Sequence, residues 1–259
     1  MSGLERRTAR IMAEDGRSLV VAFDHGLGGA NHAGMARPGQ TLDELIAAGA
    51  DAVLVSVGLV QQYSAKLARV GVVLNMDLCS GHEETAVREA MLLGVEMGKF
   101  IYTPFSTDTP DSLERTRHLV AVCHEYGLPL MVEPIPVSFE EKSAHTPENI
   151  GKAAKMACEA GADVVKMQYS GDPESFRQIM DTLYRPVVIL GGPARNNPQG
   201  VLQDIRDAMD AGAIGITIGR NIWEHERPAH MVAALAAIVH QDAPVQVAMR
   251  ELDFAMAVP

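Results

Sequence analysis

Several patterns are missing from this chain of 259 residues, and each absence excludes a class of protein. No apolar run approaches the roughly 18 residues that a membrane-spanning helix requires. The charged segment 1–16 lacks the apolar stretch of a secretory signal peptide. The formal net charge of -11 argues against a nucleic-acid surface, which needs a basic stripe, but leaves room for a local cationic pocket that binds a phosphorylated metabolite.

Cysteine and aromatic residues are also scarce. Cys79, Cys123 and Cys158 are widely spaced and form no CxxC motif. This spacing favours reduced thiols in a cytoplasm over a disulfide framework or a zinc ribbon. Because only 5% of the residues are aromatic while 47% are hydrophobic, the core must consist mainly of aliphatic side chains and methionine.

What the chain does contain is a regular alternation of β-rich runs and helical patterns. The expected strands are 18–23, 51–56, 71–76, 99–104, 129–134, 163–169, 186–192 and 215–220. Glycines 49, 98, 127, 161 and 212 are expected to end helices, and Thr41, Ser112 and Thr146 to begin them. Eight βα units in about 250 residues predict an α/β fold, a single-domain TIM (β/α)8 barrel.

The barrel is expected to occupy residues 1–259, with a short N-terminal helix at about 3–15 and a C-terminal extension at about 241–259. An open doubly wound sheet is the alternative. It is disfavoured because no GxGxxG motif follows the first expected strand.

In a TIM barrel the active site lies at the carboxyl ends of the strands, so polar residues there are the candidates. Lys166 stands inside the expected sixth strand, on the same face as Gln168, which is expected to contact the substrate. By the same alternation, Asp24 ends the first strand and Glu133 the fifth, and all three charged side chains are expected to point into the upper barrel. Burial lowers the pKa of an amine and makes it a better nucleophile, and a carboxylate can move its protons. The competing interpretation is a structural ion pair.

The turns after the seventh and eighth strands form a second candidate site. They read GGPAR (191–195) and GRNIW (219–223), at the two positions where this fold commonly binds phosphate. Gly191, Gly192 and Gly219 would let backbone N–H groups approach an oxyanion, and Arg195 or Arg220 would supply the opposite charge. The alternative is that the glycines only form tight turns.

These residues carry a family resemblance. The segments VVAFDHG, DVVKMQYSG, VVILGGP and DAMDAGAIGITIGRNIWEHERPAHMVAALAAIVH resemble the class I aldolases of the archaeal fructose-bisphosphate aldolase group. That group belongs to the Schiff-base superfamily that includes the deoxyribose-phosphate and tagatose-bisphosphate aldolases. The resemblance implies that Lys166 forms the Schiff base, that Asp24 is the strand-one carboxylate, and that Gly191, Gly192, Gly219 and Arg220 bind phosphate.

One departure from the group concerns the fifth strand. The group's fructose-bisphosphate aldolases carry a catalytic tyrosine in a motif like MYPRG, whereas this chain has MVEPIPVSF. Glu133 resembles the glutamate of the tagatose-bisphosphate and sulfosugar-phosphate branch. The resemblance therefore implies a carboxylate as the proton shuttle, with Glu133 first and Asp24 second, and a phosphorylated ketose other than fructose bisphosphate. The products would be dihydroxyacetone phosphate, or an analogue, and an aldehyde.

Three alternatives stay open. A Schiff-base transferase on the same scaffold, thiolase-like or transaldolase-like, would use the same lysine. A non-catalytic sugar-phosphate-binding protein would use Lys166 only to pair with phosphate. A zinc enzyme is disfavoured because His25, His82 and His145 share no HxH or HExxH spacing. His25 is expected to orient a substrate hydroxyl or to support Asp24, no metal or other cofactor is expected, and a cytoplasmic homo-oligomer is predicted.

Overall fold

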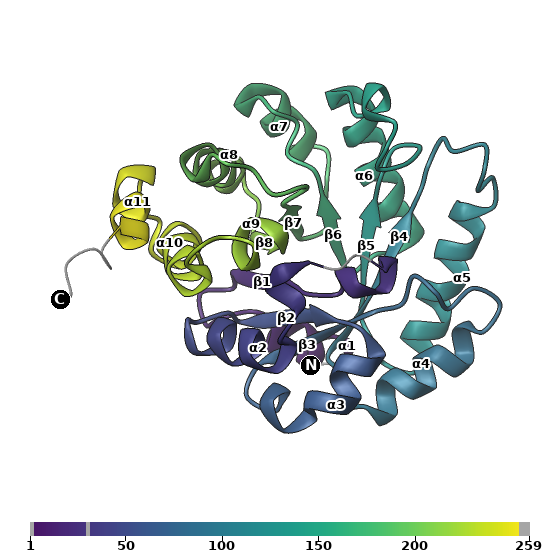
Figure 1. Ribbon diagram of the computed structural model, residues 1–259. Coiled ribbons are helices and arrows are strands. Elements are labelled where there is room, and N and C mark those ends of the chain that lie inside the picture. The colour runs from purple at the N-terminus through teal and green to yellow at the C-terminus, as the bar shows by residue number, and fades with distance from the viewer. Residues whose placement is uncertain (1–2, 30–31, 254–259) are drawn as a thin grey trace.

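The computed structural model describes residues 3–29 and 32–253, and eight parallel strands in it close into a barrel in sequence order (Figure 1). The strands are β1 (Ser18–Ala22), β2 (Ala52–Val55), β3 (Gly71–Asn75), β4 (Met97–Tyr102), β5 (Leu130–Pro134), β6 (Val164–Met167), β7 (Val187–Leu190) and β8 (Gly215–Ile218). Closure comes from the parallel pairing of β1 with β8. The predicted TIM barrel is confirmed.

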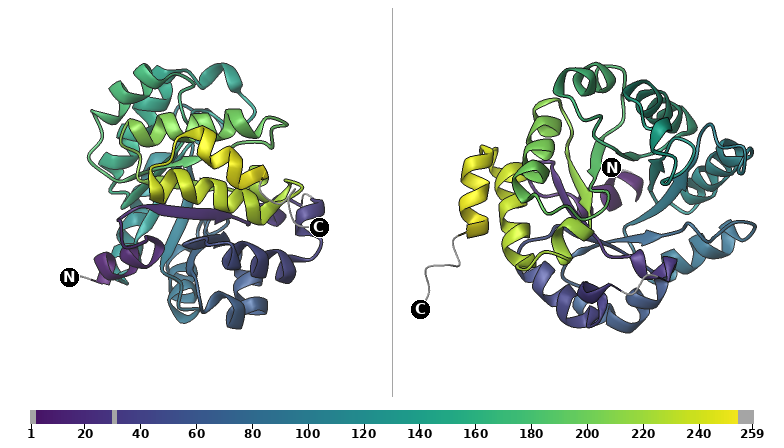
Figure 2. Two further views of the ribbon diagram at one scale, coloured as in Figure 1. Left: turned by 90° about the vertical axis from the view of Figure 1, so that its left-hand side faces the viewer. Right: turned by 45° about the horizontal axis from the view of Figure 1, so that its top comes forward.

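Helices surround the barrel, as the two views of Figure 2 show. They are α2 (Pro38–Ala47), α3 (Val57–Leu67), α4 (Glu83–Leu92), α5 (Ser112–Glu125), α6 (Pro147–Ala160), α7 (Pro173–Met180), α8 (Pro198–Asp210), α9 (Arg220–Trp223) and α10 (Pro228–Gln241). The short 3-10 helices are η2 (His25–Gly28), η3 (Ala33–Met35) and η4 (Lys142–Ala144). Among the described residues no helix is long and apolar enough to cross a membrane.

The strands bury both faces, and this divides the core in two. The larger part lies between the sheet and the helices, where Phe23, Leu119 and Leu202 are fully buried. The smaller part fills the lower barrel with Ile11, Val20, Ala22, Ala52, Leu54, Val73, Met97, Met131, Val164 and Val188. Side chains on a strand alternate between its faces, so the residue two positions further on points into the upper barrel. This spacing sets the position of the site.

Helix ends confirm some of the expected caps and correct others. Thr146 begins α6 by accepting a hydrogen bond from Asn149 N at 3.2 Å, and Gly161 ends that helix with a φ of 99°. Gly98, however, lies within β4, where an added Cβ would be 2.5 Å from Met76 Sδ, so its role is close packing. Thr41 lies inside α2 and donates to Gly34 O at 2.8 Å, and Ser112 is the first residue of α5, after the N-cap Asp111.

The chain ends flank the barrel. At the N-terminus, α1 (Gly3–Thr8) and η1 (Ala9–Ile11) are shorter than the helix expected at about 3–15, and Ile11 enters the lower barrel. At the other end, α11 (Val245–Asp253) lies against α10 and α8. Residues 254–259 of the expected extension are outside the described part.

Candidate active site

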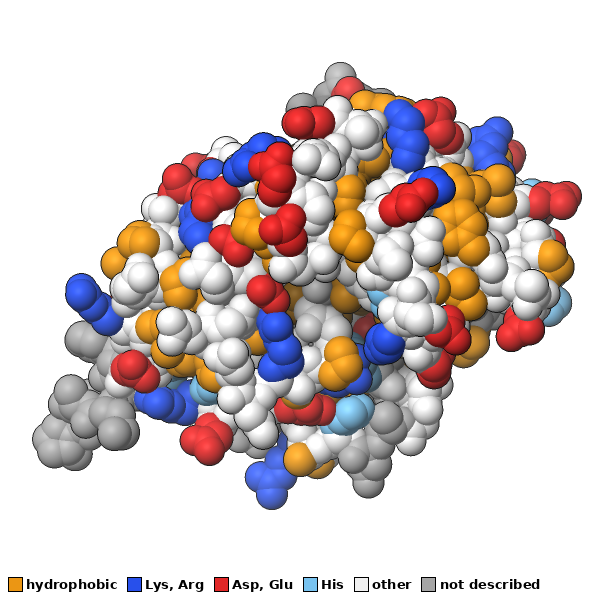
Figure 3. Space-filling view, turned by 90° about the horizontal axis from the view of Figure 1, so that it is seen from above, with side chains coloured by type: hydrophobic (Ala, Val, Ile, Leu, Met, Phe, Trp, Pro, Cys, Tyr) orange, Lys and Arg blue, Asp and Glu red, His pale blue; other side chains and the backbone are white. Residues whose placement is uncertain are grey.

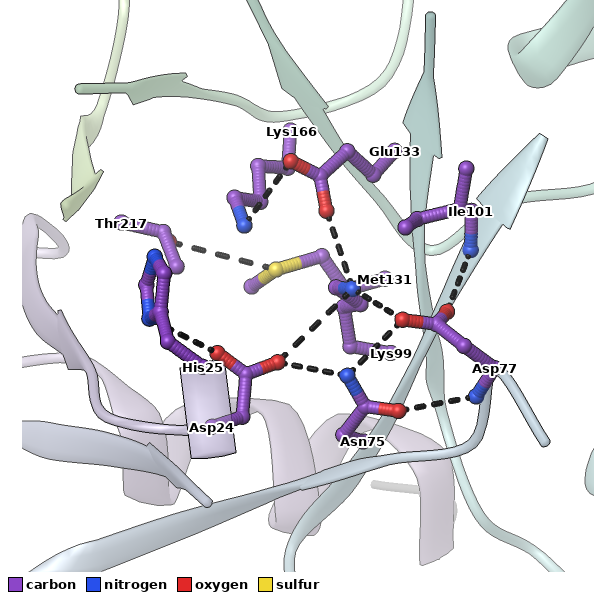
Figure 4. A network of polar contacts seen from close by, with 10 residues as sticks. All are labelled: Asp24, His25, Asn75, Asp77, Lys99, Ile101, Met131, Glu133, Lys166 and Thr217. Atoms are coloured by element: carbon purple, nitrogen blue, oxygen red, sulfur yellow. Dashed lines mark hydrogen bonds and ion pairs between the residues drawn. The ribbon is translucent and has the colours of Figure 1, made fainter. Parts of the chain in front are cut away.

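Seven polar side chains form one layer above the apolar core of the lower barrel. This polar layer consists of Asp24, Asn75, Asp77, Lys99, Glu133, Lys166 and Thr217 (Figure 4). Most of its members stand two residues after an apolar residue that fills the lower barrel, as Glu133 follows Met131 and Lys166 follows Val164. The alternation that predicted Asp24, Glu133 and Lys166 in the upper barrel therefore places them in one layer.

Lys166 and Glu133 form a buried ion pair. Nζ of Lys166 lies 3.0 Å from Oε1 of Glu133, and the two residues are only 6% and 3% exposed. Burial alone would favour the neutral acid, but the ammonium groups of Lys166 and Lys99 hold the pKa of Glu133 below its ordinary value. Glu133 is therefore a carboxylate next to the lysine, which is the state that a proton acceptor needs.

Lys99 is a second buried lysine, which the sequence reasoning missed. Its Nζ lies 2.7 Å from Asp77 Oδ2, 3.1 Å from Glu133 Oε2 and 3.9 Å from Asp24 Oδ2. Burial disfavours its charge, but Glu133, Asp77 and Asp24 together raise the pKa of Lys99 well above its ordinary value. Lys99 is therefore a permanent cation that joins the three carboxylates.

Asp24 is held by an amide as well as by charge. Asn75 Nδ2 donates to Asp24 Oδ2 at 2.5 Å and to Asp77 Oδ2 at 2.8 Å. The backbone N–H of Ile101 donates to the other oxygen of Asp77 at 2.8 Å. Although burial opposes ionisation, the charges of Lys99 and Lys166 hold the pKa of Asp24 below its ordinary value. Asp24 therefore meets the lysines as an ionised carboxylate.

His25 lies at the edge of the polar layer. Its Nδ1 is 3.6 Å from Asp24 Oδ1 and has no hydrogen-bond partner among the described residues. Burial, helped by the positive charge of Arg220, lowers the pKa of His25 to about 4. His25 is therefore a neutral imidazole at neutral pH, packed edge-on against the ring of Trp223 with 5.2 Å between the ring centroids. A neutral ring at this place can exchange a hydrogen bond with a ligand hydroxyl.

The two glycine turns lie beside the polar layer and line the same cavity of about 680 Å³, which we call the main cavity. An added Cβ would lie 2.7 Å from Ile218 Cβ at Gly191, and 2.3 Å from Ala22 O at Gly219. Gly192 has a φ of 62°, which a residue with a side chain adopts only under strain. Because these glycines have no side chain, the backbone of both turns can lie close to the barrel strands and can border the cavity.

Arg220 supplies a cation to the main cavity. Its Nε is buried and has no hydrogen-bond partner in the described part of the chain, and no ion pair involves it there. A buried guanidinium donor without an acceptor is costly, and an anionic ligand would remove that cost. Asn221, the next residue, holds the GGPAR turn in place, since its Nδ2 donates to Gly191 O at 2.8 Å and to Pro193 O at 3.2 Å.

Arg195 turns away from the main cavity, whereas Gln168 lines it. Arg195 pairs with Asp204 of α8 at 2.8 Å and lines a side cavity of about 470 Å³ behind the GGPAR turn, not the main cavity. Arg195 therefore shares the side cavity with Gly191 and Gly192 but lies outside the main cavity that Gly219 and Arg220 line. Gln168 lines both cavities.

Figure 3 views the molecule from above, where charged side chains of both signs and histidines gather around a recess. The histidines considered for zinc have separate surroundings. His145 forms hydrogen bonds with Ser138 O and Gln168, and His82 is the N-cap residue of α4. Within residues 3–29 and 32–253, no three His, Cys, Asp or Glu side chains are placed to hold a metal ion together.

Comparison with known proteins agrees with this geometry. The model of the DeoC/LacD family aldolases matches residues 18–225. A 2-amino-3,7-dideoxy-D-threo-hept-6-ulosonate synthase of Halobacterium salinarum is 33% identical over 253 residues, which cover 94% of this chain and 95% of the relative. A class 1 fructose-bisphosphate aldolase of Thermoproteus tenax is 29% identical over 93% of this chain and 96% of its own length.

A solved structure of a Schiff-base-forming fructose-1,6-bisphosphate aldolase superposes with a TM-score of 0.80 at 28% identity, covering 92% of this chain and all of the other. The family model spans every strand of the barrel and both glycine turns. The chain therefore belongs to the DeoC/LacD family of aldolases.

Proposed function

We propose that Lys166 forms the Schiff base of a class I aldolase acting on a phosphorylated ketose. The observation that carries this proposal is the buried pair of Lys166 and Glu133, 3.0 Å apart, in a layer that also holds Asp24 and Lys99. Transfer of one proton from Lys166 Nζ to Glu133 frees the amine lone pair, which attacks the ketone carbon. A second proton moves from the nitrogen of the adduct to its alkoxide oxygen, which gives the carbinolamine. Protonated Glu133 then gives its proton to the carbinolamine hydroxyl, which leaves as water and gives the iminium.

Bond cleavage uses the same carboxylate. Glu133, ionised again, accepts the proton of the C4 hydroxyl while the C3–C4 electron pair moves into the iminium. The aldehyde leaves, protonated Glu133 gives its proton to the enamine carbon, and water hydrolyses the resulting iminium to dihydroxyacetone phosphate or an analogue and the free amine of Lys166. Asp24 is the second choice for the base, since it lies in the same layer but forms no ion pair with Lys166 within 4 Å. Lys99 keeps both carboxylates ionised.

The substrate phosphate is proposed to lie at the two glycine turns. Gly191, Gly192 and Gly219 border the main cavity, and so does Arg220, whose Nε has no hydrogen-bond partner among the described residues. This fold commonly binds phosphate after its seventh and eighth strands. Arg195 is withdrawn from this set because Asp204 already pairs with it outside the main cavity. The phosphate would fix one end of the ketose so that its carbonyl meets Lys166.

The ketose is proposed to differ from fructose 1,6-bisphosphate, because β5 offers Glu133 where aldolases of that substrate carry a tyrosine motif. Similar proteins carry the names of different reactions: one is a heptulosonate synthase and another is a fructose-bisphosphate aldolase. The synthase relative also supports a second candidate, a transaldolase-like transfer in which the enamine adds to an acceptor aldehyde instead of being released. Metal independence, a cytoplasmic location and a homo-oligomeric state stay predictions.

Reduction with borohydride in the presence of dihydroxyacetone phosphate tests the assignment. The expected result is a covalent adduct on the Lys166 peptide, found by mass spectrometry and absent from Lys166→Met. Adduct on another lysine, or binding of the phosphate compound without any adduct, would overturn it. Product analysis with and without an added acceptor aldehyde separates cleavage from transfer. Repeating the cleavage assay in EDTA tests metal independence.

A further inference from the structure

The segment between β5 and α6 begins with a strained turn. Val137 has a φ of 63°, and Ser138 N donates to Pro136 O at 2.8 Å, which closes a three-residue turn. A β-branched residue at positive φ is an outlier, and such strain persists only where neighbouring contacts enforce it. One of those contacts is the hydrogen bond from Val137 N to Pro104 O at 2.8 Å.

After this turn the chain runs along the main cavity. Phe139, Glu140 and Lys142 all line it. Neither charged side chain forms an ion pair or hydrogen bond within the described part of the chain, so both are available to a ligand. The strained turn therefore directs one apolar and two charged side chains to the cavity wall; we call residues 138–142 the wall segment.

His145 fixes the wall segment to the barrel. Its Nε2 is 2.8 Å from Ser138 O, and its Nδ1 is 3.0 Å from Gln168 Nε2. A carbonyl oxygen only accepts, so Nε2 must carry the proton and donate it, and Nδ1 must accept from the amide of Gln168. These two hydrogen bonds, which we call the His145 bridge, fix the imidazole tautomer and the amide orientation together.

The bridge ends on an unsatisfied group. Gln168 Oε1 is buried and has no hydrogen-bond partner among the described residues. Gln168 stands two positions after Lys166, and both residues line the main cavity. A buried acceptor without a donor is costly, and a hydroxyl of a bound ligand would satisfy it. The bridge thus connects the ligand space at β6 with the wall segment.

The order of the strands indicates which part of a substrate meets the wall segment. The phosphate turns follow β7 and β8, the Schiff-base lysine is on β6, and Glu133, the proposed base for the C4 hydroxyl, is on β5. A ketose bound by its phosphate and its carbonyl would therefore extend toward β5 with its C4 end. That end becomes the aldehyde.

We propose that His145 is a positioning residue for aldehyde recognition: through Ser138 O and Gln168 it holds the wall segment where Phe139 and Lys142 contact the aldehyde half of the substrate. The proposal rests on the proposed function. His145 does not touch the reacting atoms, so its loss should leave Schiff-base formation intact and weaken binding of the aldehyde alone.

The test uses His145→Ala, His145→Gln and, as a matched control, His118→Ala, which removes an exposed histidine of α5. The readout is the consumption of D-glyceraldehyde 3-phosphate in its condensation with dihydroxyacetone phosphate, a reaction that can give tagatose 1,6-bisphosphate and other stereoisomers besides fructose 1,6-bisphosphate. His145→Ala should raise the KM for the aldehyde about tenfold, the loss expected for one hydrogen bond, with the KM for dihydroxyacetone phosphate and borohydride labelling unchanged. In His145→Gln the KM for the aldehyde should return most of the way to the wild-type value, because an amide can both donate to Ser138 O and accept from Gln168.

Equal rises in both KM values, or unchanged kinetics in His145→Ala, would overturn the proposal. Hydrogen–deuterium exchange gives an independent measurement, since the peptide that contains the wall segment should exchange faster in His145→Ala but not in His118→Ala. If dihydroxyacetone phosphate does not label the wild-type protein, the proposed function fails and aldehyde recognition fails with it. Hydrogen–deuterium exchange then still shows whether the His145 bridge holds the wall segment in place.

Discussion

Lys99 and Lys166 bind the two oxygens of a single carboxylate. Glu133 Oε2 lies 3.1 Å from Lys99 Nζ, and Glu133 Oε1 lies 3.0 Å from Lys166 Nζ. Among the described residues, Lys99 also has Asp77 at 2.7 Å and Asp24 at 3.9 Å, whereas Lys166 has no second carboxylate within 4 Å. The two amines thus differ in environment: Lys99 is surrounded by acids and stays charged, whereas Lys166 faces the cavity with one carboxylate as its partner. This asymmetry favours Lys166 as the nucleophile.

Replacing Lys99 by methionine should impair catalysis without preventing the Schiff base. The positive charge of Lys99 helps to keep the pKa of Glu133 and of Asp24 low, so both values should rise when that charge is lost. The acidic limb of the profile of kcat/KM against pH should therefore move to higher pH, and kcat should fall by about 10²–10³.

The same substitution leaves the buried carboxylates of Glu133 and Asp24, and the half-buried one of Asp77, without their common cation. Breaking a buried ion pair typically destabilises a protein by about 3–5 kcal/mol, and denaturant unfolding at neutral pH should show a loss of this order. Lys99→Arg, which keeps the charge, serves as the control for catalysis. An acidic limb that stays in place in Lys99→Met would contradict the role given to Lys99.

Glu133→Gln and Asp24→Asn separate the two possible bases. Glu133→Gln should lower kcat by about 10²–10⁴, the range for loss of a general base, because Gln cannot take up the proton of the C4 hydroxyl. Asp24→Asn should have the smaller effect, since Asp24 forms no ion pair with Lys166 within 4 Å. The reverse order in steady-state assays would assign the base to Asp24.

Much of this site follows from strand alternation. Lys166, Glu133 and Asp24 were predicted in the upper barrel because a parallel strand of known direction fixes which side chains point inward. Lys99 was missed for the same kind of reason: the expected strand began at residue 99, whereas β4 begins at Met97. With the correct start, Lys99 follows the buried Met97 by two positions and falls in the polar layer. A lysine within an otherwise apolar run was the available signal.

Side-chain direction in loops could not be predicted in this way. Arg195 follows the GGP turn as a phosphate ligand would, but it turns toward Asp204 of α8, and no periodicity relates the two residues. The γ-turn at Val137 is equally hidden, because a valine and not a glycine has the positive φ, and the hydrogen bond from Val137 N to Pro104 O joins residues far apart in the sequence. Loop geometry depends on tertiary contacts that a single sequence does not show.

Arg220 and Arg195 make a matched pair for the phosphate site. Arg220→Met should weaken the binding of inorganic phosphate by about 10–100-fold, because hydrogen bonds to charged groups contribute about 1.5–3 kcal/mol. Arg195→Met should change it less than about twofold, because that side chain lies outside the main cavity. Fluorescence of Trp223, the single tryptophan of the chain, follows the titration from a position against His25. Equal losses in the two variants would remove the distinction between the arginines.

His240 should make stability depend on pH at the opposite end of the barrel. Its Nε2 lies 3.0 Å from Asp51 and its Nδ1 lies 2.9 Å from Asp15. The nearby carboxylate of Asp51, opposed by burial and assisted by Asp15, raises the pKa of His240 above its ordinary value of 6.5. A folded-state pKa above the unfolded one means that the charged imidazolium stabilises the fold fully below about pH 6.5, and that this contribution is lost as the pH rises through the folded value.

The free energy of unfolding, measured in urea from pH 6 to pH 9, should therefore fall more steeply in the wild type than in His240→Gln. A glutamine can still donate a hydrogen bond to a neighbouring carboxylate but does not titrate, so the difference between the two curves isolates the charge. His118→Gln, on the exposed face of α5, should run parallel to the wild type. If the free energy of unfolding of His240→Gln falls with pH as steeply as that of the wild type, then the charge of His240 does not stabilise the fold, and the role given to it is wrong.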